Sequence, residues 1–174
     1  EARERLTSLI ESGSRSKEVL NTLAFTDLRL GDPVRAVEDL RQAIAQSPGE
    51  LTSAVLLAIA KLKQKDPKGA EAVLVKLCAD APKSSEAYMA LGEFYRSQRR
   101  WAEAEANLQK ALNLNPTNGV ALWAIANVAL AQGRSAEAEQ QFQRLSRYAN
   151  FQTVYGTFLF EQGRRDEAVR ELER

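Results

Sequence analysis

The sequence repeats itself with a period of 34 residues, and this repetition constrains the fold more than any other feature. Shifting the chain by this period aligns small residues with small residues, large apolar residues with large apolar residues, and proline with proline. Repeats of this length are typical of solenoids, in which each unit buries its apolar face against its neighbours. The aligned columns include Ala2, Ala36, Ala70, Ala104 and Ala138; Leu6, Leu40, Leu74, Leu108 and Phe142; Leu23, Leu57, Leu91 and Ile125; and Pro48, Pro82 and Pro116.

Each unit contains two segments with the periodicity of an α-helix. In the third unit, Tyr88, Leu91 and Tyr95 follow the i, i+3, i+7 spacing of one helix face, and Leu108 and Leu112 share a face of the next segment. Alanine, leucine, glutamate, glutamine and arginine dominate the chain, and all five favour helix. The pattern predicts helices near residues 17–30, 33–46, 51–64, 67–80, 85–98, 101–114, 119–132, 135–147, 150–162 and 165–174.

Short turns separate the two helices of a unit. Gly31, Gly133 and Gly163 stand where the left-handed conformation closes a helix. Asp32-Pro33 and Asp66-Pro67 each read as an N-cap followed by proline at the first helical position, where a missing N–H costs nothing. Proline at the aligned positions 48, 82 and 116 ends the second helix of three units.

Small residues occupy positions where the two helices of a unit are expected to cross. Ala104 and Gly92 are predicted to face each other in the third unit, which would allow the helices a close approach. Leu91, Tyr95 and Leu108 would fill the space on either side.

These residues resemble the tetratricopeptide (TPR) repeat. The third unit carries the family pattern as Tyr88, Leu91-Gly92, Tyr95, Ala104, Leu108, Ala111 and Pro116. The second unit departs from it, with Lys61 in the tyrosine place and Lys65 in the turn-glycine place. The resemblance implies an all-α, right-handed α-solenoid of helix-turn-helix repeats, with about five repeats and a leading half-repeat.

The last repeat is displaced. Gly163 follows Gly133 by 30 residues instead of 34, and the segment 146–150 replaces the stop proline. Tyr155-Gly156 supplies the pair that resembles Leu-Gly. We expect a single TPR array that is a fragment of a longer chain, divided into a half-repeat at 1–16, repeats at 17–50, 51–84, 85–118 and 119–148, and a truncated repeat at 149–174.

In the TPR family, the first helix of each unit lines a concave groove that binds peptides. The corresponding positions of this chain are unusually apolar, and contiguous apolar surface usually marks a binding site. We expect a protein or peptide partner there, and an amphipathic helix is one mode that such a groove accepts. The predicted groove residues are Asn21, Phe25, Leu28, Val55, Ile59, Leu62, Met89, Glu93, Arg96, Trp123, Asn127, Leu130, Thr153, Thr157 and Phe160.

One alternative to a ligand groove remains open. The same residues could pack against neighbouring first helices, so that the segment is a structural spacer or self-association segment of a larger repeat protein with no ligand of its own. Chaperone-tail binding is rejected, because that carboxylate clamp needs Lys and Asn one turn apart. The corresponding pairs here are Asn21/Phe25, Val55/Ile59, Met89/Glu93 and Trp123/Asn127.

Enzymatic activity finds no support in the sequence. The chain has no histidine, one cysteine (Cys78), and no Gly-rich phosphate loop, metal-ligand cluster or nucleophile elbow, so we expect no cofactor, no metal and no catalytic residue. A net charge of +1 argues against nucleic acid as the partner, and no apolar run is long enough for membrane insertion. The lysines at 61, 63, 65, 68 and 76 read as a solvated face. The sequence predicts no cell compartment.

Overall fold

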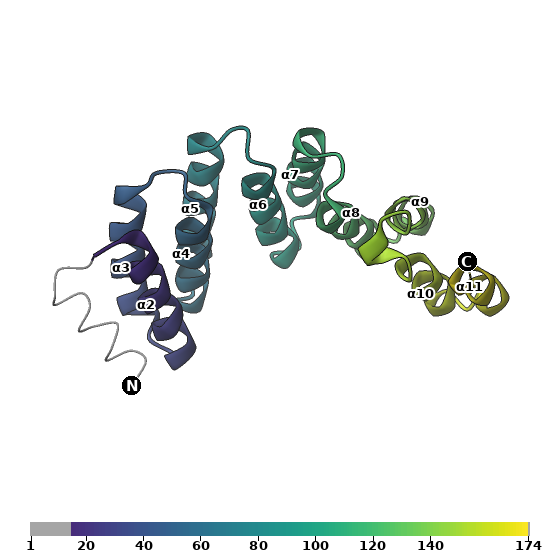
Figure 1. Ribbon diagram of the computed structural model, residues 1–174, viewed down its shortest axis with the longest axis horizontal. Coiled ribbons are helices and arrows are strands. Elements are labelled where there is room, and N and C mark those ends of the chain that lie inside the picture. Colours follow the sequence, from purple (N-terminus) through teal and green to yellow (C-terminus); the bar gives the residue numbers. More distant parts are fainter. Residues whose placement is uncertain (1–14, 174) are drawn as a thin grey trace. The chain divides into compact units, whose positions relative to one another are not determined.

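The computed structural model describes residues 15–173 and is all-helical over that part of the chain. The helices follow one another as antiparallel pairs, each closed by a short turn (Figure 1). Together they form a helical repeat solenoid. Their bounds are α2 (Lys17–Leu30), α3 (Pro33–Gln46), α4 (Leu51–Lys63), α5 (Pro67–Asp80), α6 (Ser85–Ser97), α7 (Trp101–Leu114), α8 (Gly119–Ala131), α9 (Ser135–Leu145), the 3-10 helix η1 (Ala149–Phe151), α10 (Val154–Glu161) and α11 (Arg165–Leu172).

The predicted helices are confirmed from residue 17 to the end of α8. The prediction was wrong over 150–162, where the first turn is the short helix η1 and a regular helix begins only at Val154. Helix α9 also ends at Leu145, two residues before its predicted end. The predicted half-repeat at 1–16 lies almost wholly outside the described residues.

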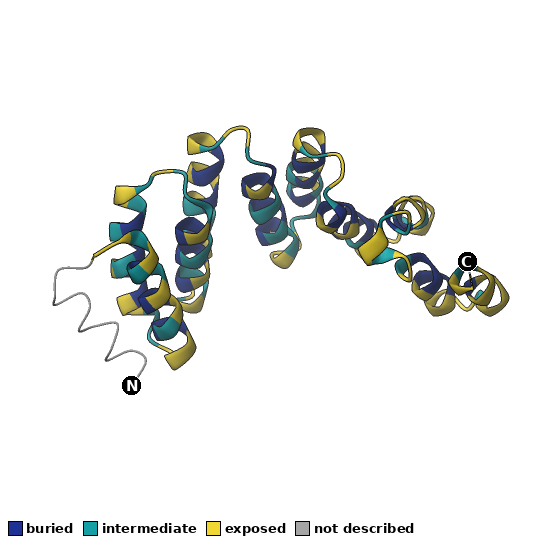
Figure 2. Ribbon diagram, viewed as in Figure 1, coloured by how far each residue is buried: buried dark blue, intermediate teal, exposed yellow. Residues whose placement is uncertain are grey.

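The chain divides into two compact units, the first ending at Leu91 and the second beginning at Gly92, within α6. In the first unit, α2 packs on α3 and α4, α3 packs on α4, and α4 packs on α5. In the second unit, α7 packs on α8, α8 on α9, α9 on α10, and α10 on α11. Buried residues lie on the helix faces turned toward these neighbours (Figure 2).

The turns and caps explain why the helices begin and end where they do. Gly31, Gly133 and Gly163 have φ angles of 83°, 73° and 77°, and Lys65 and Arg99 adopt the same left-handed conformation at 60° and 57°. The Asp32 and Asp66 side chains accept hydrogen bonds from the backbone N–H groups of Arg35 and Gly69, each with proline at the start of the helix. These predicted caps are confirmed.

The closest approach at Gly92 is to Leu108. A Cβ atom added to Gly92 would lie 2.7 Å from Cγ of Leu108, and the three nearest atoms all belong to Leu108 rather than to Ala104. Ala104 is nevertheless fully buried, as are its counterparts Ala36, Ala70 and Ala138. The aligned alanines therefore lie in the core. The absence of a side chain at Gly92 leaves room for Leu108, which lies one turn after Ala104.

Candidate partner-binding surface

The predicted groove residues of the first unit divide into exposed and structural ones. Phe25 and Ile59 are 51% and 40% exposed, and Val55 and Leu62 are half-buried. Leu28 is only 5% exposed and belongs to the core with Ala36 and Leu57, so it offers no surface to a partner. The prediction that Leu28 lies in the groove was therefore wrong, because its side chain is on the side of α2 that faces α3.

Asn21 has a structural role that the sequence pattern did not reveal. Its side-chain oxygen accepts a hydrogen bond of 2.8 Å from the hydroxyl of Ser53, which is fully buried at the start of α4. The same hydroxyl contacts Glu50 at 2.6 Å, and Glu50 caps α4 by accepting from the backbone N–H groups of Thr52 and Ser53. Asn21 thus helps to join two consecutive first helices.

Helix α6 contributes Met89, Glu93 and Arg96, all half-buried. Oε2 of Glu93 accepts hydrogen bonds of 2.9 and 2.7 Å from Nε and Nη2 of Arg96. The guanidinium carbon of Arg96 lies 6.0 Å from the centre of the Trp123 ring, within the range of a cation–π interaction. Arg96 is therefore held between a carboxylate and an indole.

Trp123 is the exposed aromatic residue of a helix that is otherwise largely buried. Most of α8 is apolar and covered by its neighbours, whereas Trp123 is 39% exposed. Nδ2 of Asn127, one turn later, donates a hydrogen bond of 2.7 Å to the carbonyl oxygen of Trp123. Leu130 follows half-buried on the same side of the helix.

Two cavities adjoin Trp123. The larger, which we call the α8–α10 cavity, has a volume of about 250 Å³, and the smaller, which we call the Phe151 pocket, has a volume of about 220 Å³. Trp123 and Val154 line both. The α8–α10 cavity is completed by Asn127, Leu130, Phe142, Thr153, Thr157, Phe158 and Glu161, and the Phe151 pocket by Val120 and Phe151.

The displaced last repeat produces this arrangement. Helix α9 ends at Leu145, three residues earlier in its repeat than α7 ends in the preceding repeat. Four residues connect α7 to α8, whereas three residues connect α9 to η1. Phe151 in η1 then packs against the start of α8, where a Cβ atom on Gly119 would lie 2.5 Å from the Phe151 ring. The glycine therefore makes room for the ring that bounds the second pocket.

The remaining predicted residues lie on α10 or just before it. Thr153 and Thr157 are exposed, and the Thr157 hydroxyl donates a hydrogen bond of 2.9 Å to the carbonyl oxygen of Thr153. Phe160 is 59% exposed, and the guanidinium carbon of Arg165 lies 5.8 Å from its ring centre. Phe160 does not line either cavity beside Trp123.

The fold and this geometry coincide with a known family. Models of the tetratricopeptide repeat match residues 27–94 and 95–157, and a second TPR model matches residues 149–174. The chain belongs to the tetratricopeptide repeat family. Members of this family generally serve as protein–protein interaction scaffolds and are generally not enzymes.

Solved structures of similar fold include other TPR proteins. A thermophilic TPR protein from Thermus thermophilus is 25% identical, with a TM-score of 0.71, and the match covers 91% of this chain and 87% of that one. PilF of Pseudomonas aeruginosa is 19% identical with a TM-score of 0.71, covering 99% and 76%. YrrB, described as a TPR protein with an unusual peptide-binding site, is 18% identical with a TM-score of 0.60, covering 98% and 90%. No curated protein matches the sequence.

In the second compact unit, ion pairs between arginine and glutamate link consecutive TPR repeats. Nη2 of Arg134 lies 2.6 Å from Oε2 of Glu105 in the preceding repeat, and Nη1 of Arg164 lies 2.7 Å from Oε1 of Glu139. Glu139 also accepts a hydrogen bond of 2.8 Å from the hydroxyl of Tyr155. The hydrogen bonds from Arg164 and Tyr155 hold the pKa of Glu139 below its ordinary value. These carboxylates serve as inter-repeat contacts.

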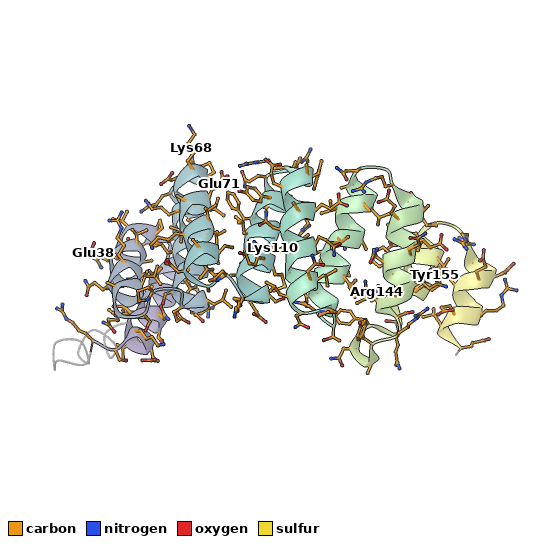
Figure 3. All side chains as sticks on the ribbon, turned by 90° about the horizontal axis from the view of Figure 1, so that it is seen from above. Glu38, Lys68, Glu71, Lys110, Arg144 and Tyr155 are labelled. Atoms are coloured by element: carbon orange, nitrogen blue, oxygen red, sulfur yellow. The ribbon has the colours of Figure 1, made fainter. Side chains whose placement is uncertain are left out.

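Lysines and the cysteine of the TPR array are paired, solvated or buried. Lys61 and Lys76 form ion pairs with Asp66 and Asp80 at 3.2 and 2.9 Å, and Lys68 extends into solvent from α5 (Figure 3). Cys78 is buried. Across residues 15–173, no group of three or more potential ligands could hold a metal ion, and no helix has the length and apolar character to span a membrane.

Six residues that line the two cavities were not predicted as groove residues from the TPR columns. None stands in a column that the family pattern assigns to the groove: they are Val120, Phe142, Phe151, Val154, Phe158 and Glu161. The only signal in the sequence was the four-residue shortening, because it moves the last repeat out of register with the columns.

Proposed function

We propose that this TPR array binds a segment of a partner protein on the face formed by its first helices, with Trp123 as the principal anchor. The observation that carries the proposal is an indole 39% exposed between two cavities of about 250 and 220 Å³. Tryptophan is enriched among the residues that dominate binding energy at interfaces.

The size and lining of the cavities favour side chains of a polypeptide as occupants. Both volumes fall below the roughly 300–1,000 Å³ of usual small-molecule and cofactor pockets. Two adjacent cavities sharing Trp123 and Val154 suit two neighbouring side chains of one segment.

The proposed function is binding without catalysis. The chain has no histidine, and the glutamates most suggestive of acid–base chemistry, Glu105 and Glu139, are engaged with Arg134 and Arg164. A C-terminal carboxylate is a poor ligand for the α8–α10 cavity, because the charged residue in its lining is Glu161. We therefore propose an internal or extended peptide segment as the ligand.

A capture experiment with a matched control tests this proposal. The array and two variants, Trp123→Ala and Leu114→Ala, are immobilised, and proteins retained from a lysate are identified by mass spectrometry. Leu114 is also 39% exposed but lies at the end of the second helix α7. We expect Trp123→Ala to lose specific partners that Leu114→Ala retains. Equal capture by both variants would contradict the role of Trp123.

Self-association is a second candidate function, favoured by exposed apolar side chains on the last helix pair. Phe160, Val169 and Leu172 are 59%, 54% and 51% exposed. If this surface joins two copies, sedimentation equilibrium should show a mass that rises with protein concentration, and Val169→Glu should abolish the rise. A monomer at all concentrations would exclude this candidate.

A further inference from the structure

Three polar side chains that line the α8–α10 cavity, Asn127, Thr157 and Glu161, offer hydrogen-bond acceptors to an occupant. The single hydroxyl hydrogen of Thr157 is donated to the carbonyl oxygen of Thr153 at 2.9 Å, which leaves the lone pairs of the Thr157 oxygen for a ligand. One of the two amide hydrogens of Asn127 is donated to the carbonyl oxygen of Trp123 at 2.7 Å, and the amide oxygen is available to a ligand.

The charge of the cavity is negative. Glu161 is exposed at its edge, and within residues 15–173 its carboxylate has no hydrogen bond or ion pair. Arg164, three residues after Glu161, is paired with Glu139 and Glu167, and the guanidinium carbon of Arg165, at the start of α11, lies 5.8 Å from the centre of the Phe160 ring. On the other side of the site, Arg96 is neutralised by Glu93 at 2.7 Å. The Glu161 charge is thus left uncompensated.

The walls of the cavity suit the aliphatic stem of a long basic side chain. Trp123, Phe142 and Phe158 are aromatic, and Leu130 and Val154 are aliphatic. Lysine and arginine bury their methylene groups along apolar surface and keep the charged end in a polar environment. An aromatic lining also attracts a cation directly.

From these observations we propose that the α8–α10 cavity receives a lysine or arginine side chain of the partner segment, whose cationic group pairs with Glu161. The adjacent Phe151 pocket, lined by Val120, Trp123, Phe151 and Val154, receives a neighbouring apolar side chain of the same segment. This inference rests on the proposed function and adds to it a partner motif of one basic and one apolar residue.

A peptide selection with a charge-reversed variant tests the motif. Random linear peptides displayed on messenger RNA are selected separately on the unmodified array, on Trp123→Ala and on Glu161→Arg. A further variant, Glu38→Arg, makes the same change in net charge at an exposed position of α3 in the other unit and serves as the control. Circular dichroism melts establish that each variant is folded before selection.

We expect the unmodified array and Glu38→Arg to enrich the same motif, with lysine or arginine next to an apolar residue. Glu161→Arg should replace the basic position by aspartate or glutamate. For a fluorescein-labelled peptide carrying the selected basic motif, fluorescence anisotropy should show binding weakened about fivefold by Glu161→Gln, in keeping with one solvent-accessible ion pair.

The outcomes separate the two proposals. Peptides that require Trp123 but show no basic preference, or an unchanged motif on Glu161→Arg, would overturn the basic-residue inference and leave the proposed function standing. Identical peptides on the unmodified array and on Trp123→Ala, or no enrichment on any form, would overturn the proposed function together with the inference built on it.

Discussion

At the scale of single residues, a glycine–leucine contact recurs sixteen positions apart in two repeats of the second unit. A Cβ atom on Gly92 would lie 2.7 Å from Cγ of Leu108, and one on Gly156 would lie 2.6 Å from Cγ of Leu172. Tyr155-Gly156 therefore plays the part that the sequence pattern assigned to it, although the repeat around it is shortened. The contact depends on the absence of a side chain at the glycine.

The alanine column gives a stability prediction at the same scale. Ala104 has no exposed surface, so the larger side chain of Ala104→Leu must displace its neighbours, and we expect a loss of about 1–3 kcal/mol in the free energy of unfolding. Thermal and urea denaturation measure the loss. Ala102→Leu, at an exposed position of the same helix, is the control. Equal stability of both variants would contradict the burial of Ala104.

The left-handed turn residues give an opposite prediction. Arg99 has a φ angle of 57°, a conformation that is unfavourable for any residue with a Cβ atom, and Gly133 occupies the equivalent place in the next repeat at 73°. Arg99→Gly should stabilise the protein by up to about 1 kcal/mol. Gly133→Ala should destabilise it by a similar amount without any clash, because a Cβ atom there meets nothing within 4 Å. Chemical denaturation of the two variants should show opposite signs.

At the scale of the helix, the caps of the second helices differ between the two units. Asp32, Glu50 and Asp66 cap their helices through side-chain oxygens, whereas Arg100, Arg134 and Arg164 stand at the cap positions of α7, α9 and α11 and make no cap bond. These arginines form ion pairs with glutamates instead. The second helices of this unit therefore use their cap residues to bind carboxylates within and between repeats, whereas Asn118 caps the first helix α8 through its side-chain oxygen.

Glu50 gives a prediction of pH dependence. Partial burial is the largest influence and would raise the pKa of Glu50, but hydrogen bonds from the Ser53 hydroxyl and from the backbone of Ser53 and Thr52 together lower it to about 2 from an ordinary 4.5. The folded pKa is depressed, so the stabilisation is complete above pH 4.5 and is lost as pH falls toward 2. Glu50→Gln should cost about 1–2 kcal/mol near pH 7 and reduce this acid sensitivity.

Urea denaturation at neutral pH and at about pH 3 measures the effect of Glu50. Glu38→Gln, at an exposed position in α3, is the control and should retain the acid sensitivity of the unmodified protein. If Glu50→Gln lost as much stability on acidification as the control, the cap would not be the source of the pH dependence.

At the scale of the whole molecule, the main helix–helix contacts among residues 15–173 join near neighbours along the chain within each compact unit. Stability in such an array is approximately a sum of repeat terms and nearest-neighbour terms. Gly156→Val should therefore accelerate amide hydrogen exchange in α10 and α11 much more than in α2 and α3. Mass spectrometry of exchanged peptides measures this, and uniform acceleration throughout would show global cooperativity instead.

The sequence by itself determined the helices and their pairing, because a period of 34 residues with helical spacing inside each repeat is typical of stacked helix pairs. It also indicated Trp123 as a candidate contact for a partner, because the residue stands in a groove column of the family pattern and aromatic residues are favoured anchors. The tertiary structure decided the rest. It buried Leu28 in the core and engaged Asn21 with Ser53.

Only the tertiary structure revealed the two cavities and the carboxylate beside them. Shortening α9 and converting the next turn to η1 bring Phe151 onto Gly119 and leave Glu161 at the edge of the α8–α10 cavity. A column alignment could not show this, because the irregular repeat is displaced by four residues from the period on which the alignment depends. Periodicity determines what the regular repeats share, whereas the departure from it shapes the surface available to a partner.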